Sequence, residues 1–168
     1  MHGLYLLSVW LHLLAMAVWI GGMIFLALVV VPVVRRPAHR ERAASLIHDS
    51  GTRFRTVGWV CLGLLVASGI VNLAYRGYDW ADLWSGRLWQ GPIGHLLGGK
   101  LLLVAVVLLL SAVHDFWIGP RATTLWQTDP DSAQALRLRR QASWFGRINL
   151  LVALAIVALG VMLVRGTP

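Results

Sequence analysis

The chain has 168 residues, of which 58% are hydrophobic and 13% charged, and its mean hydropathy is +0.69. These values exclude an ordinary soluble domain and predict one polytopic, all-α membrane domain over residues 1–168, with the lipid bilayer as its first partner. The formal charge of +8 comes almost wholly from arginine, since Lys100 is the only lysine. A nucleic-acid partner is not expected. The single cysteine, Cys61, excludes an intramolecular disulfide and a CxxC motif.

Four apolar runs each have at least the roughly 17 residues that a membrane-spanning helix needs. They cover residues 4–34, 56–75, 93–118 and 148–164. The first run contains His12 and lacks the basic start and the cleavage site of a signal peptide, so we expect it to be a spanning helix. The sequence therefore predicts a four-transmembrane-helix bundle.

The segments between these runs differ in charge. Those after the first and third runs hold eleven arginines, between Arg35 and Arg55 and between Arg121 and Arg147, whereas the opposite side holds only three. We expect a multi-pass protein of a bacterial-type inner (plasma) membrane, whose orientation follows from the positive-inside rule. Both basic segments would then be cytoplasmic, with the N- and C-termini outside.

Three connecting segments have further features. Residues 40–54, which include His48, have a helix-forming composition that suits a helix lying along the membrane surface. Residues 76–92 carry tyrosine and tryptophans suited to an aromatic belt at one membrane face. Asp131 and Ser132 can each cap the start of a helix.

A weak internal repeat relates the two halves of the chain. The first and third runs both close with proline and then arginine, and the second and fourth both open with phenylalanine and arginine and share a later glycine. The positions concerned are Pro32 and Pro120, Phe54 and Phe145, and Gly69 and Gly160. We therefore expect two pseudo-symmetric helical hairpins, in which His12 corresponds to Lys100 at a similar depth near the outer face.

The polar residues of these runs fall into two groups by depth. Toward the outer face lie His12, Asn72, His95 and Lys100, and toward the cytoplasm lie His48, His114, Asp115 and Asn149. Imidazole is an axial ligand for haem iron. For haem b, His12 with His95 would form one site and His114 with His48 a second. Glycines would make room for the macrocycle, and helix-end arginines such as Arg55, or Lys100, would neutralise its propionates.

Copper is the alternative cofactor or cargo. His12, Met16 and Met23 lie on one face of the first helix, at i, i+4 and i+11, and imidazole and thioether ligands select Cu(I).

Each of these features also has a simpler interpretation. His12 beside Trp10 would then meet water at the headgroups, and Lys100 would extend to the interface. Methionines fill gaps in cores, and glycines let helices approach closely.

Three segments resemble a known family. They are WLHLLAMAVWIGGMIFL, RFRTVGWVCLGLLVASGI and GPIGHLLGGKLLLVAVVLLL. They resemble the CopD (copper resistance D) domain, which has a first-span histidine followed by Trp and Gly, an R-F-x-x-x-A/G start to the second span, and a Y-G-x-L-L-x-x-K start to the third. Ile93 replaces the usual aromatic residue, whereas Leu96, Leu97 and Lys100 match. This resemblance implies copper uptake or tolerance.

The chain is also similar to the HemJ-type protoporphyrinogen oxidases, which share a first-span histidine seven residues before a tryptophan and a third-span lysine. That resemblance implies b-haem binding at His12, with Lys100. It does not extend to the oxidase activity, because no arginine precedes Arg35 here.

The leading interpretation is a b-haem-binding redox or electron-transfer protein of CopD-like type, alone or as a subunit of a larger membrane redox complex or with a quinone as partner. It would not be a stand-alone hydrolase. The alternatives are copper transport or copper tolerance, and a structural subunit without a cofactor.

Overall fold

The structure is a computed structural model that describes residues 2–165, without the side chains of residues 40, 41 and 83. All regular structure in this part of the chain is helical. The elements are α1 (His2–Phe25), the π-helical turn η1 (Leu26–Val30), α2 (Val31–Val34), the 3₁₀ turn η2 (Pro37–Arg42), α3 (Ala43–Tyr75), α4 (Trp80–Trp84), the 3₁₀ turn η3 (Arg87–Trp89), α5 (Gly91–Val113), the π-helical turn η4 (His114–Ile118), α6 (Gly119–Thr128) and α7 (Ala133–Arg165).

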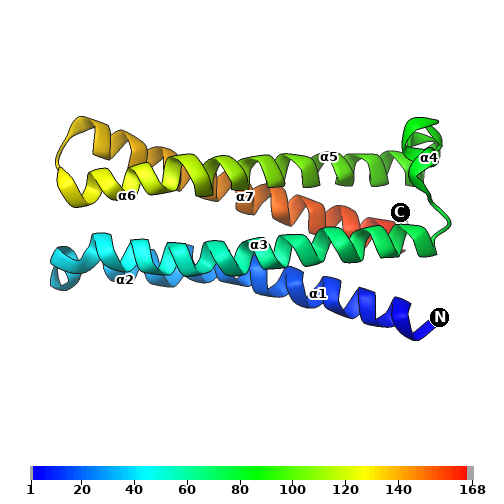
Figure 1. Cartoon of the computed structure of the whole chain (residues 1–168), viewed down its shortest axis with the longest axis horizontal. Helices are drawn as coiled ribbons and strands as arrows, with labels where there is room; N and C mark the ends of the chain where they lie inside the picture. The colour runs from blue at the N-terminus through cyan, green and yellow to red at the C-terminus, as the bar shows by residue number, and fades with distance from the viewer. Residues whose placement is uncertain (1, 166–168) are drawn as a thin grey trace.

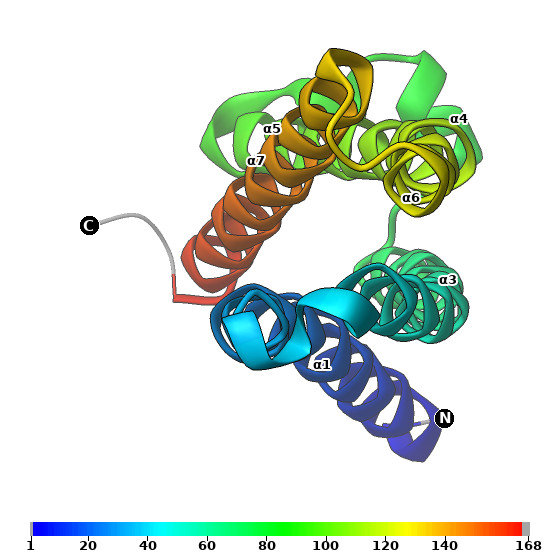
Figure 2. The same cartoon turned by 90° about the vertical axis from the view of Figure 1, so that its left-hand side faces the viewer.

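Four helical runs are long and apolar enough to cross a membrane, which confirms the predicted all-α, four-helix architecture. They are His2–Val34, Ala43–Tyr75, Gly91–Thr128 and Ala133–Arg165. α1 packs against α3 and α5 packs against α7, so the chain forms two hairpins, which Figure 1 shows lying along a common long axis. Contacts of α7 with α1 and of α3 with α6 join the hairpins, as the end-on view of Figure 2 shows.

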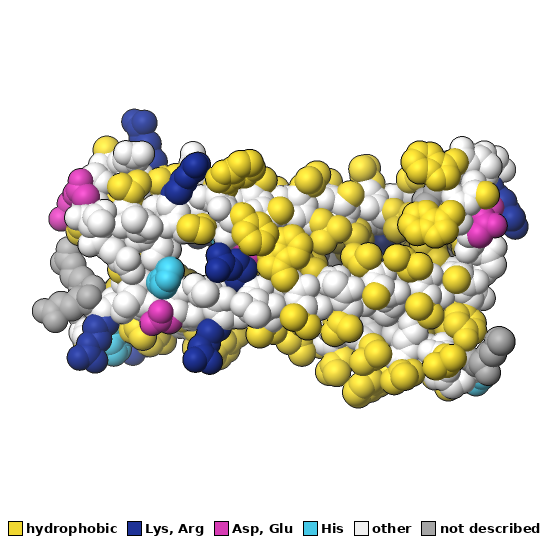
Figure 3. All heavy atoms as spheres, viewed as in Figure 1, with side chains coloured by type: hydrophobic (Ala, Val, Ile, Leu, Met, Phe, Trp, Pro, Cys, Tyr) yellow, Lys and Arg dark blue, Asp and Glu magenta, His cyan; other side chains and the backbone are white. Residues whose placement is uncertain are grey.

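The two ends of the bundle differ in character. One end, here called the α4 end, holds α4, the start of α1 and the end of α7, and the opposite, Arg-rich end holds the basic segments (Figure 1). In Figure 3 most of the blue basic side chains gather at the Arg-rich end, and hydrophobic side chains cover the middle. Trp80 and Trp84 are exposed at the α4 end, as an aromatic belt requires. The direction in which the chain crosses the membrane stays a prediction, and residues 1 and 166–168 lie outside the described part.

The second and fourth helices begin much earlier than their hydropathy predicts. α3 starts at Ala43 rather than at residue 56, and α7 starts at Ala133 rather than at 148. The expectation that residues 40–54 lie along the membrane surface is therefore wrong, because most of this segment continues α3 without a break. Hydrogen bonding in a helix does not stop where the apolar residues stop, and no proline interrupts α3. The predicted cap of α7 is confirmed, since Ser132 Oγ accepts a hydrogen bond from Ala135 N at 3.2 Å.

The internal repeat is visible in the structure. η1 ends two residues before Pro32 and η4 ends two residues before Pro120, so both hairpins have the same π-helical turn at the same place. The two groups equated by the repeat also have equivalent surroundings. His12 Cε1 lies 3.9 Å from the point where Gly69 would carry a Cβ, and Lys100 Nζ lies 3.5 Å from the same point on Gly160. These shared features support the expected pseudo-symmetric hairpins.

A small core holds the helices together at mid-height. It consists of Ala15, Trp19, Cys61, Leu62, Val107 and Ala153. Glycines admit aromatic rings here, because the Gly58 Cβ position is 3.5 Å from the Trp19 ring, and the Phe54 ring fills the space beside Gly22. Cys61 is a packed core residue, as a lone thiol in a span usually is.

Candidate functional site

The first group of polar residues lies in the half of the bundle near the α4 end, and we call it the His12 cluster: Ser8, His12, Ser68, Asn72 and Lys100. His12 Nδ1 lies 2.8 Å from Ser68 Oγ, and Ser8 Oγ donates to the Ser68 carbonyl at 3.2 Å. The hydroxyl of Ser68 also donates to the Leu64 carbonyl one turn earlier in α3. These bonds attach the histidine of α1 to α3.

The hydrogen bonds of Ser68 determine which nitrogen of His12 is free. A serine hydroxyl has one proton, and here it goes to the Leu64 carbonyl. With the proton used in this way, Ser68 accepts from the ring at Nδ1, and the backbone of Leu65 also interacts with the ring. This tautomer leaves the lone pair of Nε2 available. Metal-binding histidines are held in this way, with one ring nitrogen bonded to the protein and the other turned to the metal.

Lys100 brings a positive charge close to His12. Its half-buried side chain ends beside Gly160 of α7, and it interacts electrostatically with both His12 and Arg76. Among the described side chains, no carboxylate lies within salt-bridge distance of Lys100 or Arg76. The buried Oδ1 of Asn72 also has no hydrogen-bond partner. The His12 cluster therefore has an excess of positive charge.

His95 does not join this cluster as predicted. Its side chain is exposed near the start of α5, and no hydrogen bond links it to His12 in the described structure. The partner of His12 is expected to lie on the third span. This expectation is wrong for its hydrogen bond, because the partner in that bond is Ser68 of the second span. Lys100 is the third-span residue that acts on His12, and it does so through its charge.

The second group lies toward the Arg-rich end, around the π-helical turn η4, and we call it the Asp115 cluster: Arg55, Trp59, His114, Asp115 and Phe116. Asp115 Oδ1 is 2.8 Å from His114 Nδ1, and Asp115 Oδ2 accepts a hydrogen bond from Trp59 Nε1 at 3.1 Å. The Trp59 ring also packs on Phe116, with centroids 5.5 Å apart. The cluster thus connects α3 to η4.

Arg55 has a structural role in this cluster. In the π-helical register the N–H of residue 120 would bond to the Asp115 carbonyl, but proline has no N–H. Arg55 Nη1 donates to that carbonyl at 3.2 Å, and its guanidinium also lies over the Phe116 ring. Arg55 therefore replaces a donor that Pro120 removes, which differs from the propionate contact expected of it.

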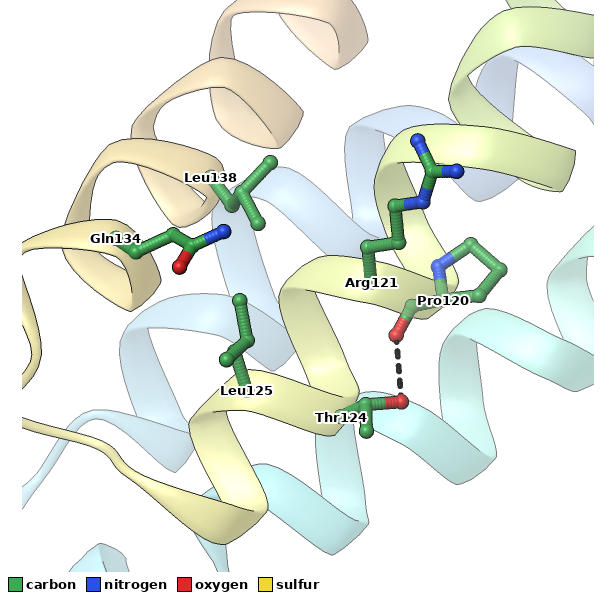
Figure 4. A pocket seen from close by; sticks show the side chains of 6 residues that line it. All are labelled: Pro120, Arg121, Thr124, Leu125, Gln134 and Leu138. Atoms are coloured by element: carbon green, nitrogen blue, oxygen red, sulfur yellow. Dashed lines mark hydrogen bonds between the residues drawn. The ribbon is translucent and has the colours of Figure 1, made fainter.

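His48 and His114 are not brought together by any described contact. His48 is exposed in a shallow hollow of α3, beside Asp49, Thr52 and Arg53. A second shallow hollow, shown in Figure 4, lies between α6 and α7 at the same end. Its walls are Pro120, Arg121, Thr124, Leu125, Gln134 and Leu138. Neither hollow includes His114. In this structure His48 and His114 therefore do not form the expected second haem site.

The predicted copper ligands lie along one face of α1 but are spread over its length. His12 and Met23 are eleven residues apart, which corresponds to about 16 Å of helix, so they cannot bind one ion together. Met23 is half-buried, and its Sδ receives a long hydrogen bond of 4.0 Å from Asn149 Nδ2. That amide also donates to Ser111 at 3.0 Å. Among the described residues no three His, Cys, Asp or Glu side chains form a metal-binding group.

Three of the glycines in the spanning helices have aromatic rings beside them, whereas Gly21 and Gly63 have no neighbouring atom within 4 Å of the Cβ position. Phe54 lies beside Gly22, and Trp19 lies beside Gly58. Trp89 fills the space beside Gly98 in the third span. These glycines serve close contact between helices and rings, which is the simpler of the two interpretations.

Comparison with known proteins identifies the family. The family described as Copper resistance protein D (CopD) matches residues 49–163. The chain belongs to the CopD family. The CopD match runs from α3 to α7 and so includes Ser68, Lys100, His114 and Asp115, whereas His12 lies before it. The relation to HemJ-type proteins stays a prediction.

One relative of this CopD-family chain covers almost its whole length. It is an uncharacterized protein of Aquifex aeolicus (strain VF5), 32% identical over 162 residues, which are 95% of each chain. That similarity includes α1. No solved structure matches the chain significantly.

Several residues of the two clusters were not singled out from the sequence of this CopD-family protein. Ser68 and Trp59 are the most important, because they hold His12 and Asp115. A signal for Ser68 was present, since it lies one helical turn before Asn72 in an apolar span and so shares its face. Trp59 had no such signal, because tryptophan is common in apolar spans.

Proposed function

We propose that this CopD-family membrane protein transports copper or confers copper tolerance, with Cu(I) as its cargo and His12 as a ligand near the α4 end. The observation that carries the proposal is the hydrogen bond from His12 Nδ1 to Ser68, which orients the ring and leaves Nε2 free. His12 also heads the face of α1 that contains Met16 and Met23. The family description, copper resistance, favours the same metal.

The spacing of the donors favours transfer over storage. Because His12, Met16 and Met23 follow one another along α1, each would bind the ion in turn with partners supplied by the ion's carrier or by neighbouring helices. Thioethers are soft ligands that select Cu(I), and they can replace one another as ligands along the helix. The membrane is expected to be a bacterial inner membrane, with the Arg-rich end in the cytoplasm.

Copper transport by purified protein in proteoliposomes tests this proposal. We expect His12→Ala to reduce the rate of Cu(I) transport by about tenfold or more. This corresponds to a rise of at least about 1.4 kcal/mol in the free-energy barrier to transport. His95→Ala is the matched control, because this histidine lies at the same end and is exposed. Equal transport by the wild-type protein and His12→Ala would overturn the role of His12, and no transport above that of empty liposomes would overturn transport itself.

The second candidate is the b-haem-binding redox protein, with a membrane redox complex or a quinone as its partner. The observation favouring it is the pair of cations, Lys100 and Arg76, near His12 without a described carboxylate, since such cations suit haem propionates. The residues fit haem only in part, because no second histidine among the described residues is brought to His12 and aromatic rings fill the space beside Gly22, Gly58 and Gly98. A reduced-minus-oxidised spectrum of the purified protein tests this candidate, and the absence of a Soret band would eliminate it.

A further inference from the structure

At the α4 end of the bundle, the basic side chains Lys100 and Arg76 have no acidic partner among the described residues. Lys100 is half-buried beside Gly160, and Arg76 follows α3 directly as its C-terminal cap. The two cations interact electrostatically with each other. The acidic residues of the neighbouring segment are already used, because Asp79 and Asp82 cap α4 reciprocally and Asp82 also pairs with Arg87 at 3.2 Å.

Such an arrangement is costly unless an anion offsets it. A half-buried ammonium loses hydration, and in a medium of low dielectric it requires a charge partner. The charged groups that interact electrostatically with Lys100 and with its neighbour His12 are themselves basic. Their repulsion increases the free-energy cost of a charged Lys100 at this site. Within the described region no carboxylate reaches either Lys100 or Arg76.

The surroundings indicate where the missing anion comes from. Arg76 is exposed and Lys100 half-buried, so a group bound by both would reach inward from the surface of the bundle. Trp80 and Trp84 are exposed on the adjoining α4, and exposed tryptophans of membrane proteins lie at the headgroup level. Arg76, next to α4, is thus placed near the level of the lipid headgroups, and Lys100, nine residues into α5, lies further inward.

We propose that Lys100 and Arg76 bind an oxyanion, namely the phosphate of an anionic lipid, between the two hairpins at the α4 end. Arginine binds a phosphate through paired hydrogen bonds, and lysine adds a point charge. The lipid joins α3 of one hairpin to α5 of the other at this end. If copper passes His12, the bound phosphate also removes the repulsion between Lys100 and the cation; this consequence alone depends on the proposed function.

Lipid titration followed by native mass spectrometry tests the proposal on the full chain. With phosphatidylglycerol as the probe, we expect Lys100→Gln and Arg76→Gln each to weaken the tightest lipid adduct about tenfold, as expected for loss of one charge-assisted hydrogen bond. Lys100→Arg should keep the adduct because it keeps the charge. Arg87→Gln is the matched control, since this arginine lies at the same end but is paired with Asp82.

The competing ligands define the remaining outcomes. Displacement of the lipid by millimolar inorganic phosphate would assign the oxyanion site to soluble phosphate while keeping its two cations. Retention of the lipid under those conditions supports the lipid as ligand. Equal binding by the wild-type protein and Lys100→Gln, or equal binding of phosphatidylcholine and phosphatidylglycerol, would overturn the site. No copper is present in these measurements, so their outcome is independent of the transport assay.

Discussion

Ser68 controls the orientation of the one histidine on which the copper proposal depends. Its hydroxyl lies 2.8 Å from His12 Nδ1 and donates to the Leu64 carbonyl, which holds the ring in place and favours the tautomer with the proton on Nδ1. Groups that orient a metal-binding histidine in this way typically contribute about ten- to a hundredfold to metal affinity.

We therefore expect Ser68→Ala to lower the affinity for Ag(I), a stable analogue of Cu(I), by about tenfold or more, because the ring loses its fixed orientation. Competition with a chromogenic chelator measures this affinity in detergent. Ser111→Ala is the control, since it removes a serine that bonds to Asn149 instead. An unchanged affinity in Ser68→Ala would show that the ring orientation does not matter for the metal.

The sequence could identify the chemically important side chains but could not assign their partners. His12 and Lys100 are conspicuous because each is an ionisable group in an apolar span. Their partners depend on how the helices are rotated against one another. That rotation turns Ser68 toward His12 and leaves His95 exposed, and it is decided by packing that hydropathy does not describe.

At the scale of the helices, the π-helical turn η4 depends on Arg55. We expect Arg55→Gln to destabilise the protein by about 1–3 kcal/mol, because a partly buried carbonyl loses its hydrogen bond to a charged donor. Unfolding by sodium dodecyl sulfate, followed by circular dichroism, measures the change. Arg53→Gln is the control, because Arg53 lies two residues earlier in α3 and is exposed.

A double-mutant cycle separates this role from a general charge effect. Pro120→Ala restores the N–H that the proline lacks, so the loss caused by Arg55→Gln should be smaller in that background. An equal loss in both backgrounds would mean that Arg55 stabilises η4 by another route.

Two adjacent glycines of α1 offer a second test of helix contacts. A Cβ on Gly22 would meet the Phe54 ring of α3, with Cδ2 at 3.1 Å, whereas one on Gly21 meets nothing within 4 Å. We expect Gly22→Ala to destabilise the protein by about 1–3 kcal/mol through overpacking and Gly21→Ala to have little effect. The same detergent unfolding assay compares them, and equal stabilities would place α1 in a different rotation against α3.

The helical runs themselves were predictable, but their ends were not. Apolar length located all four runs, and the shared prolines indicated the two hairpins. The apolar runs end earlier than the helices, however, and α3 and α7 continue beyond them through polar, Arg-containing segments. The π-helical turns could not be anticipated from Pro32 and Pro120 alone, because proline also produces ordinary kinks.

For the whole molecule, the distribution of basic residues predicts which end of the bundle faces the cytoplasm. In a Cys61→Ala background, Ser45→Cys marks the Arg-rich end and Ser85→Cys marks the α4 end, and both sites are exposed. Because basic segments are retained in the cytoplasm, we expect a membrane-impermeant thiol reagent to label Ser85→Cys but not Ser45→Cys in intact spheroplasts. The reverse pattern of labelling would contradict the predicted orientation.

The central claim is that this CopD-family protein binds copper through His12, and metal analysis with an optical spectrum on one purified sample tests it most directly. The protein should be loaded with Cu(I), freed of excess metal and compared with His12→Ala and His95→Ala. We expect bound copper in the wild-type protein and in His95→Ala, a large loss in His12→Ala, and no Soret band in any sample. A Soret band that His12→Ala abolishes, in a protein that retains no copper, would contradict the claim and establish the haem alternative.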